Sequence, residues 1–168
     1  MYQVGDRFVY GVHGICRITA LEERTVDRKK ILYYVLESKA QPGAYFYVPT
    51  HNQAAVAKLR RLLSRQELDE LLSSDAVRQE VWVSDENKRK QVYRELIGSG
   101  DRCRLISMVS SLYRHKQEQA AAGRKFHLCD ENFLRDAEKL LSSEFSEVLE
   151  IPRDQVGAYI RRTLHIDM

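Results

Sequence analysis

Short runs of apolar and polar residues fill the first 55 positions, and most of these runs end at glycine, proline or a charged turn. Strand-like runs, either alternating or rich in tyrosine, valine and isoleucine, occupy residues 7–10, 14–25, 31–36 and 44–48. Turn sequences separate them at Gly11, at residues 27–30 and at residues 41–43. No helical segment joins the strands, so the pattern predicts an antiparallel sheet, curled as a small SH3-like β-barrel.

After residue 55 the apolar positions recur every three or four residues, which predicts amphipathic helices. Ser64 and Glu67 form a capping-box sequence, and Ser84-Asp85-Glu86 is expected to open the next helix, with acids that suit the helix dipole. Asp101 and Asp130 are expected to cap two further helices. Pro152 suits the first turn of a last helix. The apolar stripes lie within residues 68–72, 92–97, 105–113, 133–148 and 156–164.

The change of pattern predicts an α+β chain of two domains. A small antiparallel β-barrel is expected over residues 1–55, and an all-α helical bundle over residues 56–168. A length of 168 residues, with 43% hydrophobic and 30% charged residues, suits two small packed domains. No apolar run approaches the roughly 20 residues of a membrane span, and the first residues lack an apolar signal core. A cytoplasmic location is therefore expected.

Candidate catalytic and metal-binding groups are few. The three cysteines, Cys16, Cys103 and Cys129, are odd in number and widely spaced, which indicates no disulfide framework and fits a reducing compartment. His13 with Cys16, and His127 with Cys129, each supply only two metal ligands, so no metal or cofactor is predicted. A reaction that uses Cys129 as nucleophile and His127 as base stays an open alternative.

Basic residues are more informative than the net charge of +3, because residues 1–54 and the remainder of the chain are each nearly neutral. They gather on one predicted helix, at the end of the next helix and in the loop that follows. This arrangement indicates either a solvated helical surface or a patch that contacts phosphates. The residues of the candidate DNA-binding patch are Lys88, Arg89, Lys90, Arg94, Arg114, Arg124 and Lys125.

Trp82 is the only tryptophan, and it stands between Val81 and Val83 just before the basic helix. An exposed aromatic ring there would suit a wedge that unstacks a DNA base step. The flanking valines instead indicate an extended segment that tucks the ring against the domain. We expect Trp82 to be mainly structural.

Five segments carry a resemblance to a known family. They are VGDRFVYGVHGICRI at residues 4–18, YYVLES at 33–38, FYVPTHN at 46–52, ENKRKQVYRELIGSGD at 86–101 and SLYRHKQEQ at 111–119. The chain resembles the CarD/CdnL family of bacterial transcription regulators over essentially its whole length. The resemblance implies a Tudor-like barrel that binds the RNA polymerase β subunit, as in the transcription-repair coupling factor. It also implies a helical domain that contacts promoter DNA and stabilises the open complex.

The resemblance also assigns particular positions. Arg24 matches a family arginine, and Tyr47, before Val48-Pro49 of the fourth strand, occupies the place of a polymerase-binding basic residue. Arg24, Tyr47, Val48 and Pro49 are therefore the candidate polymerase-binding residues.

On the helical side, Lys88 and Arg89 match two family basic positions, and His115 stands at a third. The family's wedge tryptophan aligns with Glu86, four residues after Trp82.

The leading hypothesis is a non-enzymatic transcription regulator that binds the polymerase β subunit and, weakly and without sequence preference, promoter DNA. The alternative is a protein-interaction module with no direct DNA contact. The salt dependence of DNA binding separates the two hypotheses. A monomer is favoured, although exposed strand edges also allow a domain-swapped dimer.

Overall fold

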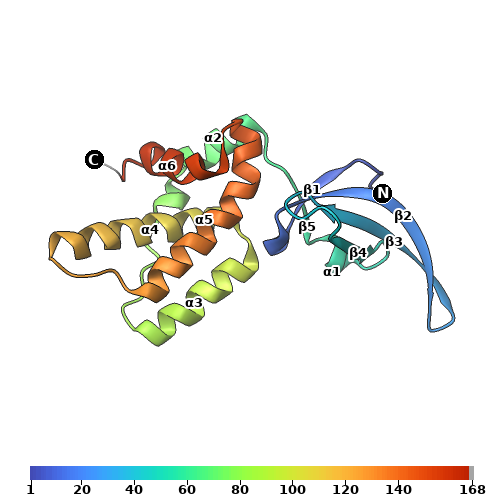
Figure 1. Cartoon of the computed structure of the whole chain (residues 1–168), viewed down its shortest axis with the longest axis horizontal. Coiled ribbons are helices and arrows are strands. Elements are labelled where there is room, and N and C mark those ends of the chain that lie inside the picture. Colours follow the sequence, from blue (N-terminus) through green and yellow to red (C-terminus); the bar gives the residue numbers. More distant parts are fainter. Residues whose placement is uncertain (167–168) are drawn as a thin grey trace. The chain divides into compact units, whose positions relative to one another are not determined.

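The computed structural model describes residues 1–166 and divides into two compact units, Met1–Leu62 and the helical remainder from Leu63 (Figure 1). The first unit is an antiparallel sheet and the second is all-helical, which confirms the predicted α+β class. Within residues 1–166, no helix combines the length and apolar character needed to cross a membrane.

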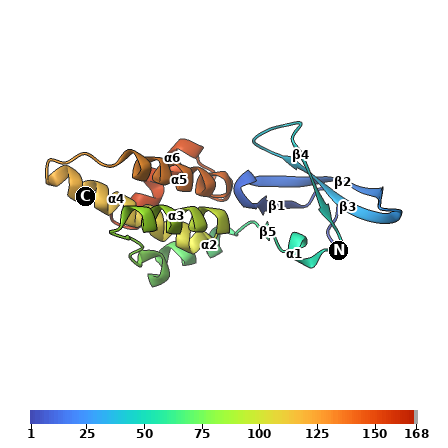
Figure 2. The same cartoon turned by 90° about the horizontal axis from the view of Figure 1, so that it is seen from below.

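Five antiparallel strands form the N-terminal sheet, in the spatial order β4-β3-β2-β1-β5. Figure 2 shows the long β2–β3 hairpin, in which Asp27 and Arg28 adopt positive φ values of 48° and 64°, as two-residue hairpin turns require. A 3₁₀ turn, Gly11–His13, follows β1, and the short helix α1, Gln53–Val56, follows β4. The strands are β1 (Arg7–Tyr10), β2 (Ile15–Val26), β3 (Lys29–Ser38), β4 (Tyr45–Pro49) and β5 (Leu59–Arg61).

The fifth strand lies beyond the expected domain boundary at residue 55. It pairs with β1, where Arg60 is opposite Val9, and it inserts Leu59 into the barrel core. The first compact unit therefore extends to Leu62. The barrel core consists of Phe8, Cys16, Ile18, Tyr34, Leu36, Val48 and Leu59.

Between residues 63 and 166 the second unit consists of five α-helices and a 3₁₀ turn. Ser64 and Glu67 form the predicted capping box, and Asp85 and Asp101 accept hydrogen bonds from the backbones of Lys88 and Arg104. Side chains from all five helices, including Leu68, Tyr93, Ile106, Phe145 and Ile160, share one core. The elements are α2 (Arg65–Ser73), η2 (Asp75–Arg78), α3 (Glu86–Ser99), α4 (Arg102–Ala121), α5 (Leu128–Leu149) and α6 (Arg153–Thr163).

The predicted cap at Asp130 is wrong. The helix α5 begins at Leu128, after the N-cap residue His127, so Asp130 lies inside the first turn and is buried. Its carboxylate binds Arg89 of α3 and not the start of its own helix. A buried guanidinium offers a carboxylate two charge-assisted hydrogen bonds, which is a stronger interaction than one backbone cap.

Candidate functional site

The strand β4 forms an open edge of the barrel sheet. The N–H of Ser38 donates to the carbonyl of Ala44 (3.0 Å), and the N–H of Thr50 donates to the carbonyl of Leu32 (2.9 Å). Every second residue of an antiparallel strand bonds to the same neighbour. Tyr45 and Tyr47 therefore direct their backbone N–H and C=O groups away from β3, to the side where a further strand could pair.

Arg24 and Tyr47 lie together on the outer face of this sheet. The Arg24 guanidinium carbon is 4.0 Å from the centre of the Tyr47 ring, a cation–π contact, and its Nε donates to Glu22 at 2.6 Å. This hydrogen bond raises the pKa of Arg24 above its ordinary value. The Tyr33 and Tyr47 rings pack edge to face, with 6.4 Å between the ring centres and 85° between the planes. The structure thus brings Arg24 and Tyr47 together, although they lie 23 positions apart in the sequence.

Val48 and Pro49 offer fewer groups to a binding partner than Tyr47 does. The Val48 side chain is 1% exposed and belongs to the barrel core, so it fixes the strand and offers a partner no side-chain surface. Pro49 has no N–H, and its carbonyl accepts a hydrogen bond from Asn52 at 3.2 Å. Outward pairing along β4 is therefore limited to the segment around Tyr45 and Tyr47, whose side chains are 50% and 41% exposed.

Trp82 is sandwiched between two basic side chains in the helical unit. Its ring stacks on His115 of α4 with 3.5 Å between the ring centres and 23° between the planes. The Arg89 guanidinium also lies on the Trp82 ring, with its carbon 4.2 Å from the ring centre. The extended segment before α3 is thus held against α3 and α4 by its aromatic ring.

Arg89 is enclosed, contrary to the expectation that it contacts DNA phosphates. Its Nε and Nη2 donate to the two carboxylate oxygens of Asp130, both at 2.9 Å, and its Nη1 donates to the carbonyl of Val83 at 3.0 Å. Burial disfavours the charged form of Arg89. The hydrogen bonds to Asp130 and the negative charge of Asp130 outweigh burial, so the pKa of the Arg89 guanidinium is raised. These contacts engage the donors that a phosphate would need.

Tyr93 lies in the same core and is fully buried. Its hydroxyl has no hydrogen-bond partner among the described residues, and burial raises the pKa of Tyr93.

Glu86 lies on the exposed first turn of α3. Its hydrogen bond with Lys90 lowers the pKa of the Glu86 carboxyl.

The remaining basic residues of the candidate patch divide into exposed and paired groups. Lys90 forms an ion pair with Glu86 at 3.0 Å, and Arg114 lies 3.6 Å from Glu80 and donates to Ser110. The exposed cations of the candidate patch are Lys88, Arg94, Arg124 and Lys125.

Three of the exposed cations, Lys88, Arg124 and Lys125, come from two segments at one end of the helical unit. Both views place the start of α3, which carries Lys88, near the loop between α4 and α5, which carries Arg124 and Lys125 (Figures 1 and 2). Arg94 lies further along α3. Because these cations come from separate elements, the sequence alone does not place them relative to one another.

Cysteine and histidine contacts give no support to a catalytic pair. The thiol of Cys129 lies 3.8 Å from Oε1 of Glu86, whereas His127 occupies the N-cap position of α5. Within residues 1–166, no three His, Cys, Asp or Glu side chains are grouped so that they could hold a metal ion.

Comparison with protein families matches both units of the chain. The model for the CarD-like/TRCF RID domain matches residues 2–63, and the model for the CarD C-terminal domain matches residues 67–161. The first match spans all five strands of the barrel, and the second runs from within α2 to within α6.

Proposed function

The chain belongs to the CarD family of transcription-associated proteins that interact with RNA polymerase, and from this premise we propose that its barrel binds the polymerase β subunit while its helical unit contacts promoter DNA. In this role the protein stabilises the open complex. A protein that binds the open complex better than the closed complex shifts their equilibrium by the difference in binding free energy. The role is non-enzymatic and places the protein in the cytoplasm.

The observation that carries the proposal is the open edge of β4. Tyr45 and Tyr47 offer outward backbone groups to a strand of the partner, and Arg24 and Tyr47 form one side-chain surface beside that edge. In strand addition, main-chain hydrogen bonds supply affinity and the neighbouring side chains supply specificity. We therefore assign β-subunit binding to the segment around Tyr47, with Arg24 as a flanking contact.

The helical unit supplies the second contact. Lys88, Arg94, Arg124 and Lys125 are exposed and suit phosphate contacts, which position a protein on DNA without reading its sequence. Docking of the barrel on polymerase raises the local concentration of the helical unit at DNA. Weak contacts by a few cations then suffice, which agrees with the net charge of +3.

A pull-down with purified polymerase β subunit tests the proposal on the full chain. Replacement of Tyr47 by Glu puts a charge beside the pairing edge and removes the ring under Arg24, so binding should weaken tenfold or more. The matched control is Val12→Glu, which adds the same charge at an exposed apolar position in the turn after β1. Equal binding by both variants would show that the surface is assigned wrongly.

A second candidate function is a helical unit that binds protein instead of DNA. It is favoured by one observation, the enclosure of Arg89, which takes one of the expected phosphate contacts away from the surface. DNA binding that falls steeply with salt supports the first function. Absence of DNA binding at every ionic strength supports the second.

A further inference from the structure

One large apolar side chain of the helical unit is left in solvent. Leu128, the first residue of α5, is 74% exposed, and between residues 63 and 166 it is the only large hydrophobic residue with an exposed side chain. Phe126, two positions earlier, packs against the core of the unit instead. An isolated exposed leucine is common on protein surfaces, so its surroundings decide what it can bind.

The start of α5 lies against the start of α3. The Cys129 thiol is 3.8 Å from Oε1 of Glu86, and the Arg89 guanidinium donates to both carboxylate oxygens of Asp130 at 2.9 Å. Cys129 and Asp130 directly follow Leu128 in the sequence. These contacts therefore place the exposed leucine beside the first turn of α3.

Three exposed cations on these two segments have no carboxylate partner among residues 1–166. Lys88 lies on the first turn of α3, and Arg124 and Lys125 lie in the loop that leads into α5. The nearby Asp85 accepts the backbone N–H of Lys88 as the cap of α3. The other carboxylates of the two helix starts are paired with different cations, and these ion pairs are Glu86–Lys90, Asp130–Arg89 and Glu131–Lys116. The surroundings of Leu128 therefore carry a positive charge that the described residues leave largely uncompensated.

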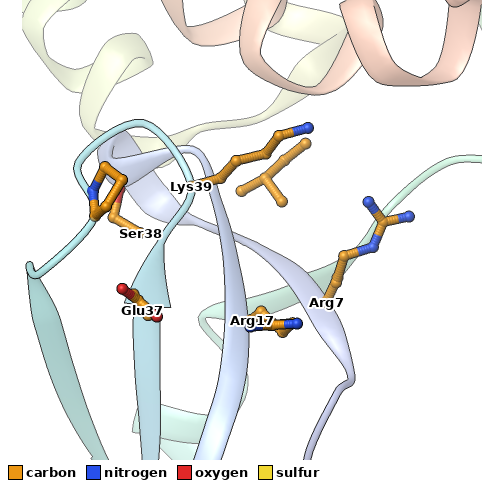
Figure 3. Close-up of a pocket in the computed structure, with 7 residues that line it drawn as sticks. Arg7, Arg17, Glu37, Ser38 and Lys39 are labelled. Carbon is orange, nitrogen blue, oxygen red and sulfur yellow. The ribbon is translucent and has the colours of Figure 1, made fainter.

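Two cations of the barrel are less available. Arg7 and Lys39 line a hollow of about 350 Å³, which Figure 3 shows, but both already interact with other residues. The three cations around Leu128 differ from them, because their positive charge is still available to an anionic ligand.

We propose that Leu128 contacts an unstacked base at the junction between paired and melted DNA, while the three cations bind the flanking phosphates. Leucine is one of the apolar side chains that enter the minor groove and unstack a base step. Unstacking a step within a closed duplex is energetically costly, whereas at a fork the outermost step is already open. The contact therefore favours forked DNA over closed duplex.

This preference rests on the proposed function and deepens it. Phosphate contacts alone bind closed and open DNA through the same backbone groups. An apolar contact that needs an unstacked base distinguishes the two states of DNA. It gives the helical unit a structural reason to bind the open complex better than the closed complex, which is what shifts their equilibrium.

Fluorescence anisotropy of the full chain tests the proposal, with a labelled duplex and a forked duplex of the same sequence as the two probes at one low salt concentration. The informative variant is Leu128→Ser, which removes the apolar side chain from an exposed site. Leu128→Met keeps an apolar side chain of similar size. The matched control is Lys125→Gln, which removes a phosphate contact three residues away and leaves the leucine in place. Circular dichroism establishes that each variant is folded.

We expect the wild-type chain to bind forked DNA about fivefold to tenfold more tightly than duplex, and Leu128→Ser to lose most of this preference. Leu128→Met should keep the preference. Lys125→Gln should weaken the binding of both DNAs by a similar factor and leave their ratio unchanged. A 2-aminopurine base at the junction should brighten when the wild-type chain binds, because its fluorescence rises on unstacking, and should brighten less with Leu128→Ser.

If the wild-type chain shows no preference for the fork, or if Leu128→Ser retains that preference, the proposal is overturned while the DNA contact of the proposed function stands. If neither DNA binds at any ionic strength, both the proposal and that DNA contact fail. Binding of the β subunit is measured separately and is unaffected by either outcome.

Discussion

Arg89 of α3 and Asp130 of α5 form a two-bond ion pair in the interior of the helical unit, with side chains 4% and 1% exposed. The same guanidinium donates to the carbonyl of Val83 and lies on the ring of Trp82. One side chain thus connects α5, the start of α3 and the extended segment before it. This relationship explains why a basic residue of the candidate DNA patch is unavailable to DNA.

Removal of one partner of this pair should strongly destabilise the protein. Asp130→Ala leaves the Arg89 charge buried and unpaired, so we expect the free energy of unfolding to fall by about 3–5 kcal/mol. Urea unfolding, followed by circular dichroism, measures the change. The control is Asp69→Ala, which breaks the exposed Arg65–Asp69 pair and should cost less than about 1 kcal/mol. Similar losses for the two variants would contradict the structural importance of the buried pair.

The Trp82 ring should stay packed against the helical unit both in the free protein and when DNA is bound. Because its ring lies between His115 and Arg89, we expect blue-shifted fluorescence that iodide quenches poorly and that forked promoter DNA leaves unchanged. His115→Ala removes one side of the sandwich and should increase iodide quenching. Red-shifted emission that forked DNA quenches would instead identify Trp82 as a wedge.

The barrel should require its fifth strand. A fragment of residues 1–62 keeps β5 and Leu59, and we expect it to unfold cooperatively and to bind the β subunit. A fragment of residues 1–55 loses the pairing of β1 with β5 and a buried leucine, whose removal alone costs about 2–5 kcal/mol. Circular dichroism with thermal melting compares the two fragments. A stable 1–55 fragment would show that β5 is dispensable.

DNA binding by the full chain should be weak, independent of sequence and sensitive to salt. Four exposed cations that each neutralise one phosphate predict that log affinity falls with log salt at a slope of about −4. Lys88→Glu should reduce both the affinity and the slope, measured by fluorescence anisotropy of a labelled duplex. Arg104→Glu is the control charge reversal. Arg104 lies at the opposite end of α4 from the 122–127 loop, so this variant should change the DNA affinity little. A salt-independent affinity would favour the protein-binding function.

Barrel stability should decrease at alkaline pH because of Cys16. Burial raises the pKa of this thiol from 9.0 to about 11. Between these values the unfolded chain releases a proton that the folded barrel retains, so the contribution to stability is complete below pH 9 and is lost as the pH rises through 11. Cys16→Ala lacks this contribution. Urea unfolding should therefore show the difference between wild type and variant shrinking from about pH 8 to about pH 10.5, and a constant difference would contradict the shift.

Local sequence determined the elements of this protein. Ser64, Asp85 and Asp101 cap helices because a side-chain oxygen reaches a backbone N–H only a few residues away, and no distant residue is needed. The hairpin turn at residues 27–28 and the alternation of outward Tyr45 and Tyr47 with inward Phe46 and Val48 are likewise local signals. The same signals, with the quoted motifs, were sufficient to identify two domains and a family.

Tertiary structure decided which charged side chains are available. Asp130 has the local sequence of a cap and Arg89 that of an exposed helix cation, yet they bury each other across 41 positions of sequence. The pairing of β5 with β1 and the proximity of Arg24 to Tyr47 likewise follow from strand register. Contacts of this kind depend on how the chain folds back on itself, because electrostatic and packing energies depend on distance in space and not on separation along the sequence.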